Sequence, residues 1–223
     1  MNNIHIIHAS RERHSQAEKT YDKWVKQLKL GDSYTIAIES DQYLDYKNLP
    51  CVVVGGGTAI IAFNEATYLL HEAWKTNDII IALSDDFPNP CDLELIRNSC
   101  EPDKLLKTFD GIQNWIVTLP IMGVGYYRHK GYIYPPQYKH MFADTHITHE
   151  AEISNTLTIR NDIVISHEHY SIGGSAKDSL NARNDKTFEQ GKAEYIKWVN
   201  GKLLPQSKEG EGLRNWLKQN TCY

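Results

Sequence analysis

A short apolar run that ends in two adjacent aspartates constrains this chain more than any other feature. Residues 79–83 read Ile-Ile-Ile-Ala-Leu, and Ser84, Asp85 and Asp86 follow at once. The run is short and rich in β-branched residues, which is typical of a buried strand in a parallel sheet covered by helices. Open α/β sheets bind ligands at the carboxyl ends of such strands. Neighbouring carboxylates repel each other, and their oxygen ligands suit Mg²⁺ or Mn²⁺. The alternative is a solvated Asp-Asp turn before Pro88.

Strand-like and helix-like segments alternate through the first hundred residues. Apolar runs predict strands at 4–9, 34–38, 51–54 and 79–83, and amphipathic segments predict helices at 15–30 and 59–74. Strand, helix, strand, strand, helix, strand is the order of α/β proteins with parallel strands and right-handed crossovers. The sequence therefore predicts an α/β fold with a mainly parallel central sheet flanked by helices.

The second half of the chain is less regular. We expect helices at 91–98, 144–151 and 184–199, and a last one around 213–217. Strands are expected at 115–118 and 163–166, with short strands or a hairpin in the Gly- and Tyr-rich segment 123–134. No internal repeat or linker divides the 223 residues, a length that suits one domain.

Composition excludes several classes of protein. A formal net charge of −4 argues against a general nucleic-acid binder, which would carry a basic stripe. No apolar stretch approaches the ~20 residues of a membrane span, and histidines interrupt the apolar start of the chain, so neither a transmembrane segment nor a signal peptide is expected. The four cysteines, Cys51, Cys91, Cys100 and Cys222, lack metal-finger spacing, which favours reduced thiols and a cytoplasmic location. The oligomeric state is open, a homo-oligomer included.

Gly55, Gly56 and Gly57 lie between a predicted strand and a predicted helix. Backbone N–H groups in such a loop can cradle a phosphate. The run matches neither the Walker loop nor the dinucleotide fingerprint. The alternative is a tight loop that needs positive φ.

His167 and His169 flank Glu168 directly after a predicted strand. Alternation in an extended segment puts the two imidazoles on the same side. One of them can complete a metal site begun by Asp85 or Asp86, or both with a carboxylate can bind zinc or non-haem iron. The alternative is a pair of histidines without a ligand.

Asp144 opens the predicted helix at 144–151. Aspartate is favoured at a helix N-cap. The same carboxylate can act as a general base toward an acceptor hydroxyl. The two roles are compatible, because a capped carboxylate is also a well-positioned base.

Taken in order, these segments resemble the small GT-A glycosyltransferases, close to the family 2 nucleotide-diphospho-sugar enzymes. The likeness covers residues 3 to about 200. In the first half, the likeness rests on the first strand with Ala9, Ser10, Arg11, Glu12 and Arg13, and on Glu39 and Asp41 after the second strand. It continues with Gly55 to Thr58 and the following Ala62, Phe63, Asn64, Glu65 and Ala66, and with Ser84-Asp85-Asp86, which resembles an Asp-x-Asp motif. In the second half, it rests on Phe142 to Thr145 and on His167 and His169. Ser84 and Ala143 replace acidic residues that are common in the family.

The resemblance implies metal-dependent transfer of a sugar, with inversion, from a nucleoside diphosphate sugar to a hydroxyl of a glycan or other acceptor. The donor would be a UDP-sugar by family frequency. Residues 1–100 would form the nucleotide-sugar half, 101–200 the acceptor side, and 201–223 a C-terminal tail. Mn²⁺ or Mg²⁺ would be bound by Asp86 with His167 or His169, and Asp144 would be the base. The donor would be bound by Ala9, Ser10, Arg11, Arg13, Glu39, Asp41, Gly56, Gly57, Asn64, Ser84 and Asp85.

Two other functions fit the same residues. The first is a metal-dependent hydrolase that uses His167, His169, Asp85 and Asp144. The second is a non-catalytic module that binds a nucleotide sugar without turnover. Zinc retained through dialysis would favour the first, and binding of UDP and metal without reaction would favour the second.

Overall fold

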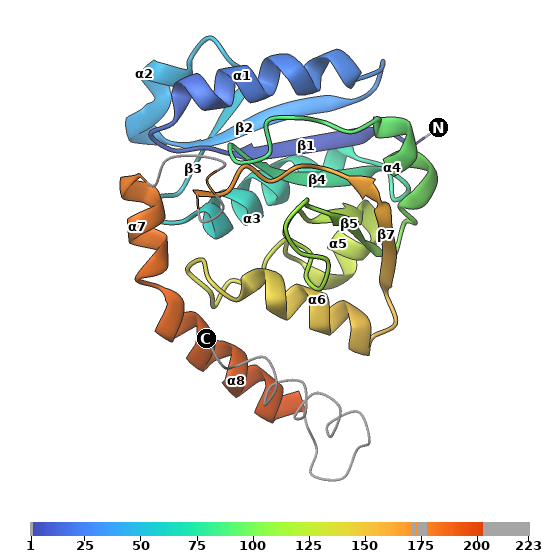
Figure 1. Ribbon diagram of the computed structural model, residues 1–223. Coiled ribbons are helices and arrows are strands. Elements are labelled where there is room, and N and C mark those ends of the chain that lie inside the picture. The colour runs from blue at the N-terminus through green and yellow to red at the C-terminus, as the bar shows by residue number, and fades with distance from the viewer. Residues whose placement is uncertain (1, 171–172, 174–177, 203–223) are drawn as a thin grey trace.

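The computed structural model describes residues 2–170, 173 and 178–202. A seven-stranded sheet in the order β3-β2-β1-β4-β6-β5-β7 forms its centre (Figure 1). The strands are β1 (Ile4–Ala9), β2 (Ser33–Glu39), β3 (Cys51–Val54), β4 (Ile79–Ser84), β5 (Leu105–Phe109), β6 (Ile121–Gly123) and β7 (Leu157–Val164). The α-helices are α1 (His14–Trp24), α2 (Tyr43–Tyr46), α3 (Ala59–Leu70), α4 (Leu93–Ser99), α5 (Val124–Lys130), α6 (Ala143–Ile153), α7 (Ser179–Asp185) and α8 (Phe188–Lys202).

The strand directions bring the carboxyl ends of the first four strands to one edge of the sheet. Strands β3, β2, β1 and β4 are mutually parallel, β6 is antiparallel to both β4 and β5, and β7 is parallel to β5. The chain proceeds outward from β1 to β2 and β3 on one side and then returns to place β4 on the other. Strand order therefore reverses between β1 and β4, and such a switch point is where open α/β sheets bind ligands.

Side chains of alternate residues in β4 enter two separate cores. Ile79, Ile81 and Leu83 pack with residues of α1 and α4, whereas Ile80 and Ala82 pack with residues of α3, α5 and α6. Figure 1 shows α1 on one face of the sheet and α3, α5 and α6 on the other. The run at 79–83 is apolar throughout because both of its faces are covered, as expected for a parallel strand.

Several predictions from the second half were wrong. The segment 115–118 has no strand, and the predicted hairpin within 123–134 is helix α5, which ends at Gly131 in the left-handed region (φ 79°). Strand β5 was missed because Lys107 interrupts its apolar pattern, although this side chain is buried and its Nζ donates to the Asn114 carbonyl. Pairing with β6 and β7 outweighs the local signal here.

Three predicted boundaries moved. The helix at 15–30 ends as an α-helix at Trp24 and continues as a short 3₁₀ turn to Gln27. The strand at 163–166 is the end of a longer strand, β7. The helix at 184–199 is divided, with α7 ending at Asp185 and α8 beginning at Phe188. The helix expected around 213–217 lies outside the described residues.

No helix in the described part of the chain combines the length and the apolar character needed to cross a membrane.

Candidate active site

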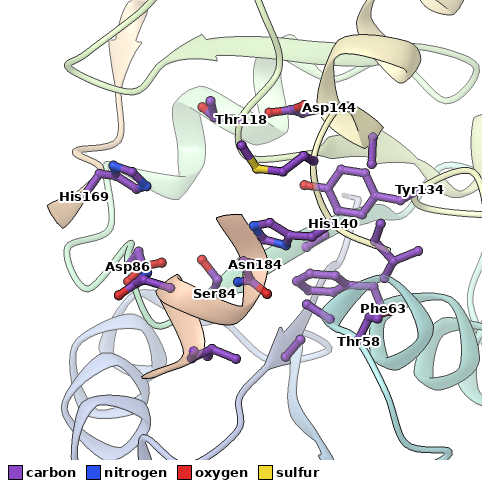
Figure 2. Close-up of a pocket in the computed structure, with 18 of the residues that line it drawn as sticks. Thr58, Phe63, Ser84, Asp86, Thr118, Tyr134, His140, Asp144, His169 and Asn184 are labelled. Carbon is purple, nitrogen blue, oxygen red and sulfur yellow. The ribbon is translucent and has the colours of Figure 1, made fainter. Parts of the chain in front are cut away.

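A cavity of about 590 Å³ opens at the carboxyl ends of β1 and β4. Its floor is formed by the residues that follow these two strands, and its walls by the start of α3, the loop 112–118, the start of α6 and the segment that follows β7. Helices α7 and α8 close the remaining side. Figure 2 shows Asp86 and His169 on one side of this space and Asp144 with Thr118 on another. Both halves of the chain therefore contribute to one cavity.

Asp85 ties the two floor strands together. Its carboxylate accepts hydrogen bonds from His8 Nε2 (2.9 Å) and Ser10 Oγ (3.0 Å), and the Tyr34 hydroxyl donates to His8 Nδ1 (2.7 Å). All of these groups are buried. Asp85 lies at the cavity floor with both oxygens engaged, so it holds the β1 and β4 loops in register.

Asp86 faces the cavity and is paired with Arg13. Arg13 Nη1 donates to Asp86 Oδ1 (3.0 Å), while its Nε and Nη2 donate to Asp178 (2.8 Å) and Asn181 (3.2 Å) at the start of α7. Burial raises the pKa of Asp86, although Arg13 and His167 act in the opposite direction. One guanidinium thus links the β1 loop, the β4 loop and α7.

Two carboxylates, Glu39 at the end of β2 and Glu65 in α3, hold the glycine loop. Glu39 accepts a hydrogen bond from the Gly57 N–H (3.2 Å) and is paired with Arg11, which also contacts Asp41 (3.1 Å). The Gly55 N–H donates to Glu65. The N–H groups of Gly55 and Gly57 are thus occupied by side chains of the protein, and Gly57 adopts the positive φ (127°) of a tight loop.

Asp144 lies in the first turn of α6, at the cavity wall. The prediction that it caps the helix was wrong, because the N-cap position belongs to Phe142, whose φ is 70°. The Asp144 carboxylate instead accepts a hydrogen bond from the backbone N–H of Thr145 (2.7 Å). Burial raises the pKa of Asp144, and the hydrogen bonds from Thr145 act against that effect. A carboxylate with a raised pKa is a stronger base than an exposed one.

His167 and His169 line the cavity next to Asp86. The ring of His167 stacks on Phe87, with centroids 4.4 Å apart and planes inclined by 15°, and it lies 5.0 Å from the ring of His169. The backbone N–H of Glu168 donates to the Asp86 carbonyl (2.8 Å). The segment after β7 is therefore hydrogen-bonded directly to the loop after β4. This contact holds the two histidines near Asp86, which they would need in order to bind the same ligand.

Asp86 and the two histidines can supply part of the coordination shell of a cation whose other ligands come from the substrate. Within the described residues, no group of three or more His, Cys, Asp or Glu side chains is arranged to hold a metal ion. However, Mg²⁺-type sites use one or two carboxylates and complete their shell with substrate phosphates and water. Asp86 with an imidazole of His167 or His169 supplies such a donor set on one side of the cavity.

Three predicted donor-binding residues lie outside this cavity. Asp41 contacts Arg11 at the surface, and Gly56 lies in the loop next to Glu39. Asn64 supports the cavity wall from behind, because its Oδ1 accepts from the Ile133 N–H (2.8 Å) and its Nδ2 donates to the Tyr134 carbonyl (2.7 Å). The other predicted residues line the cavity: Ala9, Ser10, Arg11, Arg13, Glu39, Gly57, Ser84, Asp85, Asp86, Asp144, His167 and His169.

Sequence reasoning missed several polar residues of the cavity. Arg183 and Asn184 come from α7, Lys192 from α8, and His140 from the loop before α6. Burial lowers the pKa of His140 to about 4, so this imidazole is neutral near pH 7. No local pattern marks these residues, and Arg183, Asn184 and Lys192 reach the cavity only because α7 and α8 fold back to it.

No protein-family model matches the chain, and a search of curated proteins also finds no match. Among solved structures, a protein from Desulfovibrio desulfuricans G20 described as a "putative nucleotide-diphospho-sugar transferase" is similar, with 11% sequence identity and a TM-score of 0.45 over 86% of this chain and 99% of that chain.

Proposed function

We propose that this protein is a glycosyltransferase that moves a sugar from a nucleoside diphosphate sugar to a hydroxyl group. The observation that carries the proposal is the cavity at the β1–β4 switch point, which is lined by Asp86, the two histidines and Asp144. Dinucleotides and mononucleotides bind at such switch points in open α/β sheets. The UDP donor, the inverting course and the metal dependence are part of the proposal.

Asp144 is the proposed general base. It accepts the proton of the acceptor hydroxyl while that oxygen forms a bond to the anomeric carbon of the sugar, and the bond from this carbon to the diphosphate oxygen breaks. Placing a base for this transfer typically contributes ~10²–10⁴ in rate. The raised pKa of Asp144 and its anchoring by Thr145 support the assignment.

The opposite side of the cavity would stabilise the leaving diphosphate. Asp86 with His167 or His169 would hold Mn²⁺ or Mg²⁺, which supplies positive charge to the departing phosphate oxygens. Arg13 already places a guanidinium beside Asp86. The start of α3 at Thr58 and Ala59 also lines the cavity, and helix N-termini favour anions.

A thermal-shift screen of nucleotide sugars with and without Mn²⁺ tests the proposal. A ligand at 100 times its Kd stabilises the fold by about 2.7 kcal/mol, which raises Tm by roughly 5–10 °C for a chain of this size. We expect such a shift with one nucleotide sugar in Mn²⁺, and its loss in Asp86→Ala. We also expect Asp144→Asn to keep the shift but to lose transfer.

The other outcomes identify the rival functions. Retained zinc with no response to any nucleotide sugar would contradict the proposal and favour a hydrolase. A shift without sugar transfer or donor hydrolysis by the wild-type protein would favour a binding module. Near-normal turnover by Asp144→Asn would remove this residue as the base.

A further inference from the structure

A buried carboxylate that no motif marked lies directly behind His167. Asp110 follows β5 and is 2% exposed. Its Oδ1 accepts hydrogen bonds from the N–H groups of Ile112 (2.8 Å) and Gln113 (2.7 Å), which closes a turn in the cavity wall. Its other oxygen, Oδ2, lies 3.7 Å from His167 Nδ1.

These two atoms face each other, and although burial acts to raise the pKa of Asp110, the side chains of His167 and Thr118 both act to lower it. Both Asp110 Oδ2 and His167 Nδ1 are buried, and neither has a hydrogen-bond partner within the described chain. A buried polar atom left unpaired is destabilising, which favours closure of the gap between them. Catalytic hydrogen bonds are often long before a ligand binds and tighten in the complex. A carboxylate can only accept here, so the closed contact requires the proton on Nδ1.

The backbone keeps His167 in this place. The His167 N–H donates to the Asp110 carbonyl (2.8 Å), and the next N–H, of Glu168, donates to the Asp86 carbonyl (2.8 Å). The imidazole stacks on Phe87. The His167 side chain is nevertheless 16% exposed although its Nδ1 is buried, and the residue lines the cavity.

We infer that Asp110 is a positioning residue that keeps His167 in the Nδ1–H form and so presents an unprotonated Nε2 to the cavity beside Asp86, ready to bind a divalent cation. The binding of a cation rests on the proposed function, whereas the orientation of the His167 ring does not depend on it. Metal-binding histidines usually donate their second N–H to a carboxylate or carbonyl, and losing that partner typically costs 10–100-fold in metal affinity.

Asp110→Asn is the sharpest test, because it changes only one of the two oxygens. The asparagine Oδ1 can still accept from Ile112 and Gln113, while its NH₂ replaces the oxygen that faces His167. An NH₂ donor favours an unprotonated Nδ1 and therefore moves the proton to Nε2, which can then no longer bind a cation. Asp92→Asn is the matched control, since Asp92 also accepts a backbone N–H (from Glu94, 2.9 Å) but caps α4 away from the cavity.

The experiment has two readouts on the full chain. Long-range ¹H–¹⁵N NMR, with His167→Ala to assign the signal, should show the Nδ1–H tautomer in the wild type and the Nε2–H tautomer in Asp110→Asn. Mn²⁺ affinity, measured by electron paramagnetic resonance in the presence of UDP, should fall ~10–100-fold in Asp110→Asn and stay unchanged in Asp92→Asn. In a His167→Ala background, Asp110→Asn should cause no further loss.

Three results would overturn the inference: an Nε2–H tautomer in the wild type, an unchanged tautomer in Asp110→Asn, or an equal loss of Mn²⁺ affinity with and without His167. Failure of the proposed function looks different. A wild-type protein that shows the Nδ1–H tautomer but binds no Mn²⁺, with or without UDP, would contradict metal-dependent transfer and still support the positioning of His167 by Asp110.

Discussion

Gly191 of α8 provides a test of how this helix is docked against the cavity. A Cβ added at Gly191 would lie 2.2 Å from the Met141 carbonyl oxygen and 2.9 Å from its carbon, whereas real Cβ atoms essentially never approach within 3.0 Å. The obstacle is backbone and cannot swing away as a flexible side chain would. Gly191→Ala therefore forces α8 or the loop before α6 to move.

The expected cost follows from two opposing terms. Alanine in place of glycine favours a helix by up to ~1 kcal/mol. Overpacking costs about 1–3 kcal/mol, and a backbone neighbour places this site at the upper end. Gly191→Ala should therefore lower the free energy of unfolding by about 2 kcal/mol, which lowers Tm by roughly 4–8 °C in a chain of this length. Gly201 lies in the same helix with nothing within 4 Å of its added Cβ, so Gly201→Ala should be neutral or stabilising by up to ~1 kcal/mol.

Thermal and urea denaturation of the two variants, followed by circular dichroism, measure this difference. Because Met141 and Phe142 line the cavity, Gly191→Ala should also weaken binding of any cavity ligand, while Gly201→Ala should not. A Gly191→Ala variant as stable as Gly201→Ala would refute the placement of α8 against the loop before α6.

Three further predictions concern the site and the core. Arg13→Ala removes three hydrogen bonds from a guanidinium that is 10% exposed and should cost about 2 kcal/mol in urea denaturation. Asp162→Ala breaks an exposed ion pair with Arg160 and should cost much less, and equal costs for the two variants would contradict the linking role of Arg13. Burial raises the pKa of Asp144 above the ~4 of an exposed aspartate, and a general base must be ionised to act. The value of kcat/KM should therefore fall as the pH is lowered through this raised pKa, and a pH–rate profile that is flat down to pH 4 would exclude Asp144 as the base. Burial raises the pKa of Cys100 to about 12, so its thiol should resist alkylation at pH 8 until the protein is denatured. Rapid alkylation of Cys100 in the native protein would contradict the packing around α4.

The strand-end residues were the part of the site that sequence reasoning located best. Ser10, Asp86 and His167 each follow a strand, and all three line the cavity. Their prediction needed only strand periodicity and the rule that parallel strands end at the same edge. Asp110 also follows a strand, but its strand was missed because of Lys107, so its carboxylate was overlooked as well.

Local patterns failed where contacts from distant segments decide the structure. The residues 123–134 contain the tyrosines and glycines of a plausible hairpin, yet 124–130 form helix α5. The turn into this helix packs against Pro102 so closely that a Cβ at Gly123 would lie 2.0 Å from the Pro102 carbonyl oxygen. Asp144 carries the sequence signal of an N-cap, yet the N-cap is Phe142, two residues earlier, and the helix begins at Ala143. Tertiary packing overrides such weak local preferences.

The amino-acid sequence alone determined the α/β class, the apolar strand at 79–83 and the row of polar side chains at strand ends, because periodicity and turn chemistry are local properties of a chain. Only the tertiary structure decided which of these side chains are available to a ligand. Asp85 and Asp86 are neighbours of identical chemistry, but one is tied to His8 and Ser10 while the other faces the cavity beside His167. The physical reason is that the partners of each carboxylate come from segments more than 70 residues away, and their positions are set by the packing of the whole sheet.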